Sequence, residues 1–287
     1  MTELSTERRM WSLFEPVHAV TYFAPAARQA FEEAGLRGYW RGYFAGRSAP
    51  LGAVNPAPVI AAFYGFAPAM VTRALPDVWT RVSPEGALEA RRLGAHRALA
   101  EATAGLSGVD EAASLLKAAA LEAEGYGRVL GAANAALPWP QDPLDVLWQA
   151  ATVLREHRGD GHVAALLVEG LDGCESMVWR IGLVGGGREA AQPARGWNDE
   201  QWEAARLRLH QRGYLDGEGG ATEKANSAYR TIEETTDQLA AGPWHALGRA
   251  STERCAALLE PIAARLARLL PEYPVWIRLP MPAGGES

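Results

Sequence analysis

Cysteine and long apolar runs are both scarce in this chain. Its two cysteines, Cys174 and Cys255, form no spaced motif, which predicts free thiols in a reducing cytoplasm rather than a disulfide framework. No apolar run approaches the roughly 18 residues that a membrane span requires. The N-terminal residues 1–16, MTELSTERRMWSLFEP, are charged and lack an apolar segment, so we expect no secretory signal. The sequence therefore predicts a cytoplasmic protein with no membrane partner.

The common catalytic and phosphate-binding motifs are also missing. No serine lies in a G-x-S-x-G elbow. The glycine-rich stretch GLVGGGRE at 182–189 lacks the lysine and the spacing of a phosphate loop. These absences argue against a conventional hydrolase, kinase or nicotinamide enzyme, and no pattern points to a cofactor. Whether the protein catalyses any reaction stays open.

Lysine is the third scarce residue type. Only Lys117 and Lys224 are lysines among the 28 basic residues, a bias expected of a GC-rich genome such as that of an actinobacterium. The formal net charge is −6, so the molecule as a whole does not attract nucleic acid. Any contact with DNA would depend on a local basic patch.

Helix-forming residues dominate what is present. Hydrophobic residues make up 48% of the chain, alanine leads them, and β-branched residues are few, which predicts a mainly α fold. Sliding the chain against itself aligns residues 38–66 with 125–153 without a gap, and both copies place Asn or Asp before a proline. We predict a duplicated helical module over 1–103 and 104–187, followed by a third segment over 188–287.

The first copy contains the candidate ligand site. Gly38, Gly42 and Gly46 share one face of a predicted helix, and this face admits either a neighbouring helix or a flat ligand at close range. The second copy loses most of the surrounding aromatic residues, which favours a binding surface, with close helix packing as the alternative. The predicted pocket is lined by His18, Tyr22, Tyr39, Tyr43, Arg47 and Tyr64. In it, the arginine would bind an anion or a carbonyl and the aromatic rings would form the walls.

The stretch REHRGDGH at 155–162 is the one place where a metal is considered. We expect a helix end and a glycine-rich loop there, and His157, Asp160 and His162 are possible ligands of a divalent metal. Their spacing matches no established metal motif and two neighbouring arginines oppose a cation, so we predict no metal and expect Asp160 to cap the next helix. The stretch 159–182 then predicts a helical hairpin with its turn at Gly170.

The C-terminal third has the clearest local signals. Asn198 and Gln201 form a capping box, and Gly213 ends the helix that they begin. The turn GEGG lies between YLD and AT, which is typical of a two-stranded β-hairpin. Thr222 then caps a long helix that reaches Ala240. A helix, a tight hairpin and a long helix form the back half of a winged helix.

Two resemblances follow from these stretches. WEAARLRLHQRGYLD and ATEKANSAYRTIEETTDQL resemble the recognition helix, the wing and the next helix of winged-helix regulators of the multiple-antibiotic-resistance type. Over nearly the whole chain, EPVHAVTYFAP, GYFAGRSAPLG and LREHRGDGHVAALL resemble an actinobacterial helix-turn-helix-like family. The first resemblance implies a winged-helix domain and, through the C-terminal helix at 251–270, a homodimer. Packing of that helix within its own domain is the alternative.

The resemblance also assigns a DNA-reading role to the helix over 199–212. Its candidate contacts are Arg206, Arg208, His210 and Arg212. Acidic residues at the start of this helix would repel phosphate, and residues 188–287 hold 12 basic against 14 acidic side chains. Two functions remain. One is a ligand-responsive transcriptional regulator; the other is a small-molecule-binding protein or an unusual enzyme of secondary metabolism that keeps the winged helix as a scaffold and binds no DNA.

Overall fold

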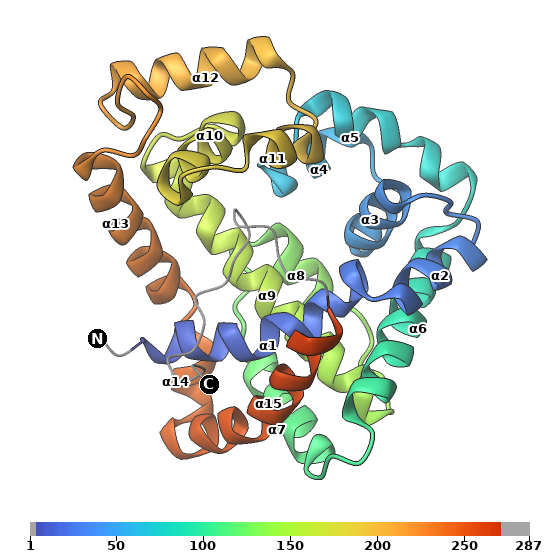
Figure 1. The fold of residues 1–287 in the computed structure, drawn as a ribbon. Helices are drawn as coiled ribbons and strands as arrows, with labels where there is room; N and C mark the ends of the chain where they lie inside the picture. The colour runs from blue at the N-terminus through green and yellow to red at the C-terminus, as the bar shows by residue number, and fades with distance from the viewer. Residues whose placement is uncertain (1–3, 271–287) are drawn as a thin grey trace.

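Helices form nearly all the regular structure in residues 4–270, the part of the chain that the computed structural model describes (Figure 1). The first helices are α1 (Thr6–Phe23), α2 (Pro25–Glu33), α3 (Tyr39–Ser48), α4 (Pro56–Phe63), α5 (Pro68–Ala74), α6 (Pro84–Thr103), α7 (Val109–Leu121) and α8 (Val129–Ala135). The later helices are α9 (Pro143–Val168), α10 (Gly173–Val184), α11 (Arg188–Arg195), α12 (Asp199–Gln211), α13 (Glu223–Leu239), α14 (Gly242–Leu247) and α15 (Arg249–Leu269). Two short 3-10 helices cover Ala49–Leu51 and Asp77–Thr80. The mainly α prediction is confirmed.

Three apolar clusters hold these helices together. The first joins α1, α6, α7, the start of α9, α14 and α15. The second joins the helices α2, α3, α4, α5 and α6 to one another. The third joins the end of α9 to α10, α11, α12 and α13. Helix α9 runs through the middle of the molecule and belongs to both the first and the third cluster (Figure 1). We call α10 to α13, residues 173–239, the outer unit, and α9 is its main connection to the rest of the fold.

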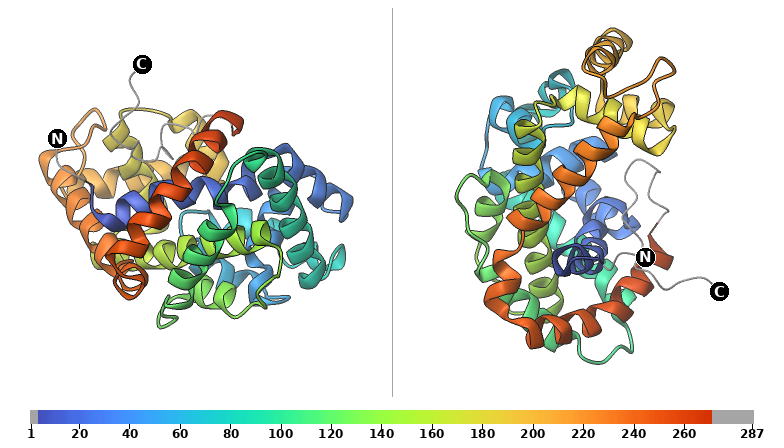
Figure 2. Two further views of the ribbon diagram at one scale, coloured as in Figure 1. Left: turned by 90° about the horizontal axis from the view of Figure 1, so that it is seen from below. Right: turned by 90° about the vertical axis from the view of Figure 1, so that its left-hand side faces the viewer.

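The C-terminal helix α15 packs within its own chain. It lies against α1 and α7 (Figure 2), and its apolar residues Leu259, Ile262 and Leu266 are buried in the first cluster, whereas Leu269 is 49% exposed. Of the two alternatives for this helix, intrachain packing accounts for its apolar stripe. The first cluster thereby draws on all three of the predicted segments, whose boundaries stay predictions.

The order of helices follows the internal alignment of the sequence. Helices α2, α3 and α4 correspond to α7, α8 and α9, and Pro56 and Pro143 both lie in the first turn of their helices. The caps before them differ, because the Asp142 carboxylate accepts the N–H of Leu144 at 2.9 Å whereas the side chain of Asn55 makes no capping bond. The expectation of a capping side chain holds only for the second copy, and the duplication stays a prediction.

Local capping rules predicted the outer unit well. Asn198 and Gln201 form the expected capping box at the start of α12, and the Thr222 side chain accepts the N–H of Ala225 at the start of α13. Gly213 follows α12 with a φ of +75°, the left-handed conformation that favours glycine. These boundaries are confirmed, and they place α12 on the outside of the molecule (Figure 1).

The predicted β-hairpin of the wing is wrong. Leu215 and Ala221 form a single antiparallel bridge, and no strand is present in residues 4–270. The segment between α12 and the Thr222 cap of α13 is short, and the Asp216 carboxylate holds its turn by accepting two backbone N–H groups. Backbone hydrogen bonds from Thr222 to Tyr214 and from Asp216 to Gly220 flank this bridge, but the pairing stops there and forms no strands. The winged-helix hairpin is therefore not supported.

The REHRGDGH stretch is helical, so the expected helix end and glycine-rich loop are wrong. Helix α9 continues unbroken through it to Val168. A Cβ at Gly161 would lie 2.7 Å from Nη1 of Arg128, so this glycine serves close packing rather than a turn. The turn occurs at Gly170, which has a φ of +70° and lies between α9 and α10.

The glycine face of α3 is filled by the protein itself. A Cβ at Gly42 would lie 2.9 Å from Cγ of Phe31, and a Cβ at Gly46 would lie 2.6 Å from Cζ of the same ring. Gly38 differs, because it precedes α3 with a φ of +88° and faces open space. The close-packing alternative therefore describes Gly42 and Gly46.

Two observations bear on the predicted compartment. Cys174 and Cys255 are buried and free, and burial raises the pKa of both thiols to about 12. None of the helices in the described chain has the length and apolar character to cross a lipid bilayer.

Candidate functional site

A cavity of about 340 Å³ lies where the outer unit meets the rest of the fold. Its walls come from α1, α3, α4 and α9 on one side and from α10, α11 and α13 on the other. Sites for small ligands have volumes of about 300–1,000 Å³, so the cavity is large enough for a small organic molecule.

The lining of the cavity is both basic and aromatic. Five arginines contribute to it: Arg47, Arg155, Arg158, Arg180 and Arg195. The carboxylates in the lining are Glu15 and Glu233. The aromatic residues are Trp11 on α1, Tyr43, Phe63, Tyr64 and Phe66 on the α3–α4 side, and Trp179 and Tyr229 on the α10–α13 side. Apolar walls with a few convergent charged groups are typical of ligand sites.

On the α3–α4 side, Arg47 is held by a buried carboxylate. Its Nε and Nη2 donate to the two carboxylate oxygens of Glu156, both at 2.9 Å, and its Nη1 donates to the hydroxyl of Tyr43 at 3.1 Å. The guanidinium also lies 4.3 Å from the ring centre of Phe63. Burial opposes ionisation of Glu156, but Arg47 and Arg155 outweigh it and hold the pKa of Glu156 below its ordinary value. The pair is therefore ionised and fixes the wall.

In the middle of the cavity, Arg155 lies between two glutamates. Its Nη1 donates to Glu156 at 3.0 Å, and its Nε is 3.7 Å from Glu15. Burial raises the pKa of Glu15, although Arg155 and the indole N–H of Trp11 partly offset this effect. Arg195 lies 4.4 Å from the ring centre of Phe66, and burial lowers its pKa. Burial thus disfavours the charged form of both the Glu15 carboxylate and the Arg195 guanidinium.

On the α13 side, an ion-pair network joins three helices. Nη2 of Arg158 on α9 is 2.7 Å from Asp237 on α13. Arg8 on α1 pairs with the same aspartate at 3.1 Å and also with Glu233. Burial lowers the pKa of Arg158, which Asp237 only partly offsets. These ion pairs hold α13 to α1 and α9 beside the cavity, in addition to the apolar packing of the third cluster.

Two buried donors in this region have no acceptor within residues 4–270. They are Nη1 of Arg158 and Nε1 of Trp179, both on residues that line the cavity. Arg180 also lines it, forms no ion pair in the described chain, and lies 5.7 Å from the ring centre of Tyr229. Most buried polar groups in proteins are hydrogen-bonded, so unmatched donors beside a cavity call for an explanation.

The six residues predicted to line a ligand pocket divide between this cavity and two smaller spaces. Tyr43, Arg47 and Tyr64 line the 340 Å³ cavity. His18 and Tyr22 line a space of about 10 Å³, and Tyr22 and Tyr39 line another of about 20 Å³. Spaces of this volume are near the limit for a single water molecule. Tyr43 lines all three spaces, so it separates the water-sized spaces from the ligand-sized one.

Tyr64 combines a strained backbone with a role in the wall. Its φ is +47°, which is rare for a residue other than glycine. Its hydroxyl donates to the carbonyl of Leu171, and the adjacent Gly65 carbonyl accepts the indole N–H of Trp197 at 3.0 Å. Strained residues persist where their surroundings hold them and are frequent at ligand sites. Here the loop after α4 is fixed directly to the outer unit.

The residues predicted to contact DNA all have partners within the protein. Arg206 pairs with Glu203 at 2.7 Å, and Arg208 pairs with Asp172 and Glu175. Arg212 donates to backbone carbonyls of the α9–α10 turn. The ring of His210 interacts with the carbonyl of Leu215 through Nδ1. Arg208 and Arg212 thus connect α12 to the α9–α10 turn and to the start of α10, whereas Arg206 and His210 have partners on α12 or directly after it.

A family model described as a helix-turn-helix family matches residues 7–270. The chain belongs to this helix-turn-helix family. No curated protein and no solved structure matches it. In this helix-turn-helix protein, the turn at Gly170 connects α9 to α10, and α12 packs against α10 on the outside of the molecule (Figure 1).

The sequence-based prediction missed the arginines of α9, α10 and α11 that line the cavity. Arg155, Arg158 and His162 line the cavity at intervals of three and four residues, which is the spacing of one helix face. This signal was present in REHRGDGH, but interpreting the stretch as a loop concealed it. No comparable pattern marks Arg180 or Arg195, because tertiary packing brings them to the cavity.

The residues considered as a metal site in this helix-turn-helix protein face three different partners. The Asp160 carboxylate accepts the N–H groups of Leu130 and Gly131 at the start of α8, at 2.9 and 2.8 Å. Nδ1 of His162 is 3.0 Å from the hydroxyl of Thr236 on α13. His157 is buried, and burial together with Arg128 lowers its pKa from 6.5 to about 4. Asp160 thus binds the start of α8, which precedes α9 in the sequence, so the expectation that it caps the next helix is wrong.

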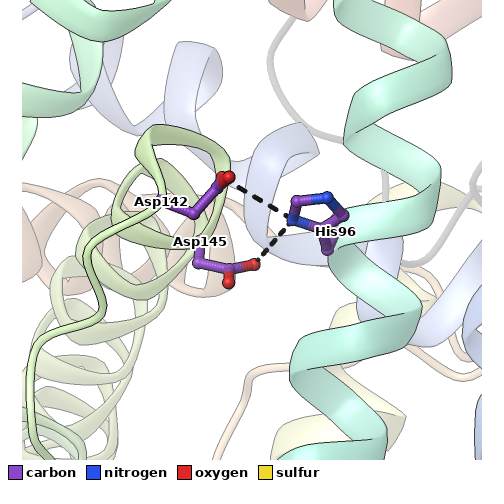
Figure 3. Close-up of side chains that lie close together, drawn as sticks. All are labelled: His96, Asp142 and Asp145. Atoms are coloured by element: carbon purple, nitrogen blue, oxygen red, sulfur yellow. Dashed lines mark hydrogen bonds and ion pairs between the residues drawn. The ribbon is translucent and has the colours of Figure 1, made fainter.

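Another histidine and two aspartates meet between α6 and α9 (Figure 3). Nδ1 of His96 lies 3.0 Å from Asp145 and 3.6 Å from Asp142. Arg92 pairs with Asp145, and Asp142 caps α9 through the N–H of Leu144. A positive charge and a backbone donor already satisfy these carboxylates, so the cluster is a helix-to-helix ion pair.

Proposed function

We propose that this protein is a small-molecule receptor whose ligand occupies the cavity between the outer unit and the rest of the fold. The observation that carries the proposal is the 340 Å³ cavity with walls from both parts of the molecule. The strained Tyr64 backbone and the unmatched donors of Arg158 and Trp179 support it. A pocket of this size between two packed units is a common place for a ligand.

The position of the cavity suggests what binding would change. A ligand that contacts α9 and α13 together would favour the arrangement of the outer unit that it fits best. We therefore propose that this cytoplasmic protein is a ligand-responsive regulator, with His18, Tyr22 and Tyr39 supporting the Tyr43–Arg47 wall from behind rather than touching the ligand. A winged-helix mode of the multiple-antibiotic-resistance type and a homodimer have no support beyond the sequence resemblance.

A cavity-filling variant tests the receptor function. Val163 lines the cavity on α9, whereas the neighbouring Ala164 is exposed. We expect a compound library to contain molecules that raise the melting temperature of the wild type, because a ligand specific to the folded state stabilises it. Val163→Trp should abolish these shifts, and the matched control Ala164→Trp should keep them. Shifts that persist in Val163→Trp would place binding elsewhere and contradict the proposal.

DNA binding is the second candidate, and family membership favours it. The internal pairing of Arg206, Arg208 and Arg212 favours the opposite alternative, in which the outer unit is a scaffold for a binding protein or an unusual enzyme. Selection from a pool of random DNA duplexes, followed by fluorescence anisotropy over a salt series, separates the two. A regulator should bind a selected duplex with an affinity that falls steeply as salt rises. If the anisotropy stayed constant at low salt for every selected duplex, DNA binding would be rejected and only the receptor function would remain.

If DNA binds, charge-removing variants show whether α12 makes the contact. Arg206 makes its ion pair to Glu203 on the surface of α12, so Arg206→Gln should leave the fold intact. We expect this variant to weaken duplex binding and to reduce the salt dependence. Arg73→Gln on α5, an exposed arginine far along the chain from α12, is the matched control. Equal binding by both variants would move the DNA contact away from α12.

A further inference from the structure

The charges around the cavity do not balance, and this imbalance indicates the class of ligand if the proposed receptor function is correct. Five arginines and two glutamates line the cavity. The charged groups directly paired with the lining add two carboxylates, Glu156 and Asp237, and one further arginine, Arg8. Even with Arg195 left out, these groups comprise five guanidinium groups and four carboxylates. A buried excess of one sign is costly unless a counter-charge is supplied.

Apart from Arg195 on α11, the excess lies at the α10–α13 end, where Arg158, Arg180 and Arg8 meet only Asp237 and Glu233. Arg47 and Arg155 both contact Glu156, whereas Arg180 forms no ion pair in the described chain. Nη1 of Arg158 and Nε1 of Trp179 have no acceptor there. All three residues donate hydrogen bonds and none of these groups accepts them. What this end of the cavity lacks is therefore an acceptor with negative charge.

We propose that the cavity binds a small organic anion, with its carboxylate or phosphate oxygens accepting hydrogen bonds from Arg158, Trp179 and Arg180. The apolar body of the ligand extends toward the rings of Tyr43, Phe63 and Phe66 on the opposite side. Planar guanidinium groups suit carboxylate and phosphate oxygens because they donate in a fixed fork. The body then replaces water next to aromatic rings, which is favourable for apolar surface.

One carboxylate at this end has to be reconciled with an anionic ligand. Glu233 lines the cavity, but it pairs with Arg8 on α1. The anion would therefore meet Arg158 and Arg180 rather than a free glutamate. Burial lowers the pKa of Arg158, which Asp237 only partly offsets. A bound anion would raise this pKa again.

Three probes with one body and different charges test this inference. They are 2-naphthoate, 2-naphthyl phosphate and the neutral 2-naphthamide, titrated into the full chain by calorimetry. We expect at least one anion to bind about tenfold more tightly than the amide, the size of a charge-assisted hydrogen bond. The better anion of the two identifies the preferred head group, carboxylate or phosphate.

Removing one charge then tests the assigned end of the cavity. Arg180→Gln loses no ion pair, so it should fold, and it should bring the anion and the amide within about threefold of each other. Arg73→Gln, on the exposed side of α5, is the control and should preserve the preference. Equal or tighter binding of the amide by the wild type overturns the inference and leaves the receptor function standing. Failure of all three probes also overturns it, and the Val163→Trp library comparison decides the receptor function separately.

Discussion

The two faces of α3 are packed in opposite ways, one closely and one against a cavity. On one face, Gly42 and Gly46 let the Phe31 ring lie directly on the backbone, and the spaces left are of about 10 and 20 Å³. On the other face, Tyr43 and Arg47 border the 340 Å³ cavity. Small residues close the first face, whereas the second face carries the large side chains of Tyr43 and Arg47, which Glu156 holds in place.

This contrast explains why small residues alone are a poor indicator of a binding site. A glycine stripe permits close approach, but the nearest side chain of the same protein is the usual occupant because interiors are close-packed. Volume persists where neighbouring groups are charged on several sides and cannot interpenetrate. In this protein, the arginines rather than the glycines mark the ligand-sized space.

The first prediction concerns the ion pair between Arg47 and Glu156 on the cavity face of α3. Glu156 is 2% exposed and binds Arg47 with both oxygens. Glu156→Ala should lower the free energy of unfolding by about 3–5 kcal/mol, because it leaves a buried guanidinium without its counter-charge. Urea unfolding followed by circular dichroism measures this. The double variant Arg47→Met with Glu156→Leu should be less destabilised than the single one.

A matched control for this prediction lies on the surface. Glu200 on α12 is exposed and makes no ion pair in the described part of the chain. Glu200→Ala should change the free energy of unfolding by less than about 0.5 kcal/mol. If Glu156→Ala behaved like this control, the wall would not depend on the ion pair, and the distinction between the two faces of α3 would lose its physical basis.

The helices of the outer unit could be predicted because their ends are encoded locally. The Asn198 capping box, the Gly213 end and the Thr222 cap each involve residues within one helical turn. Such signals do not depend on what the rest of the chain does. The same local rules overestimated the hairpin, because its backbone pairing is limited to the residues next to the turn, from Tyr214–Thr222 to Asp216–Gly220, and forms no strands.

The cavity could not be predicted in the same way, because its walls come from distant parts of the sequence. The prediction included Tyr43, Arg47 and Tyr64, which lie close to one another in the chain. It omitted Arg158 because Gly159 and Gly161 were interpreted as a loop. Gly161 is instead a contact point for Arg128 and for Leu239 of α13. Packing against those two residues overrides the weak helix propensity of glycine, and the sequence gives no direct sign of it.

The second prediction extends the comparison to the two faces of α9, one on the cavity and one closed against α8. His157 lies on the closed side, where a Cβ added at Gly131 would lie 3.0 Å from Cα of His157. Its pKa is lowered from 6.5 to about 4 by burial and by Arg128. A histidine that binds its proton more weakly when folded stabilises the folded state above its unfolded pKa. This contribution is lost as pH falls from about 6.5 to about 4.

The size of this pH effect follows from the pKa shift of His157. The shift corresponds to about 3 kcal/mol of unfolding free energy between the pKa of the unfolded state and that of the folded state. Asp160 on the same helix acts in the opposite direction, because burial raises its pKa to about 6 and it favours folding at the acidic end. Urea titrations at a series of pH values should therefore show a smaller loss at low pH in His157→Gln than in the wild type. Parallel curves would mean that His157 is not the group responsible.

The third prediction compares two glycines directly, one on each kind of surface. A Cβ at Gly46 would lie 2.6 Å from the Phe31 ring, whereas a Cβ at Gly159 in the cavity wall would find its nearest atom at 3.7 Å. Gly46→Ala should lower the free energy of unfolding by about 1–2 kcal/mol, since overpacking exceeds the helix propensity gained. Gly159→Ala should raise it by up to about 1 kcal/mol, because only the propensity changes. Opposite signs in urea unfolding would separate a filled face from an open one, and equal signs would show that the cavity closes in solution.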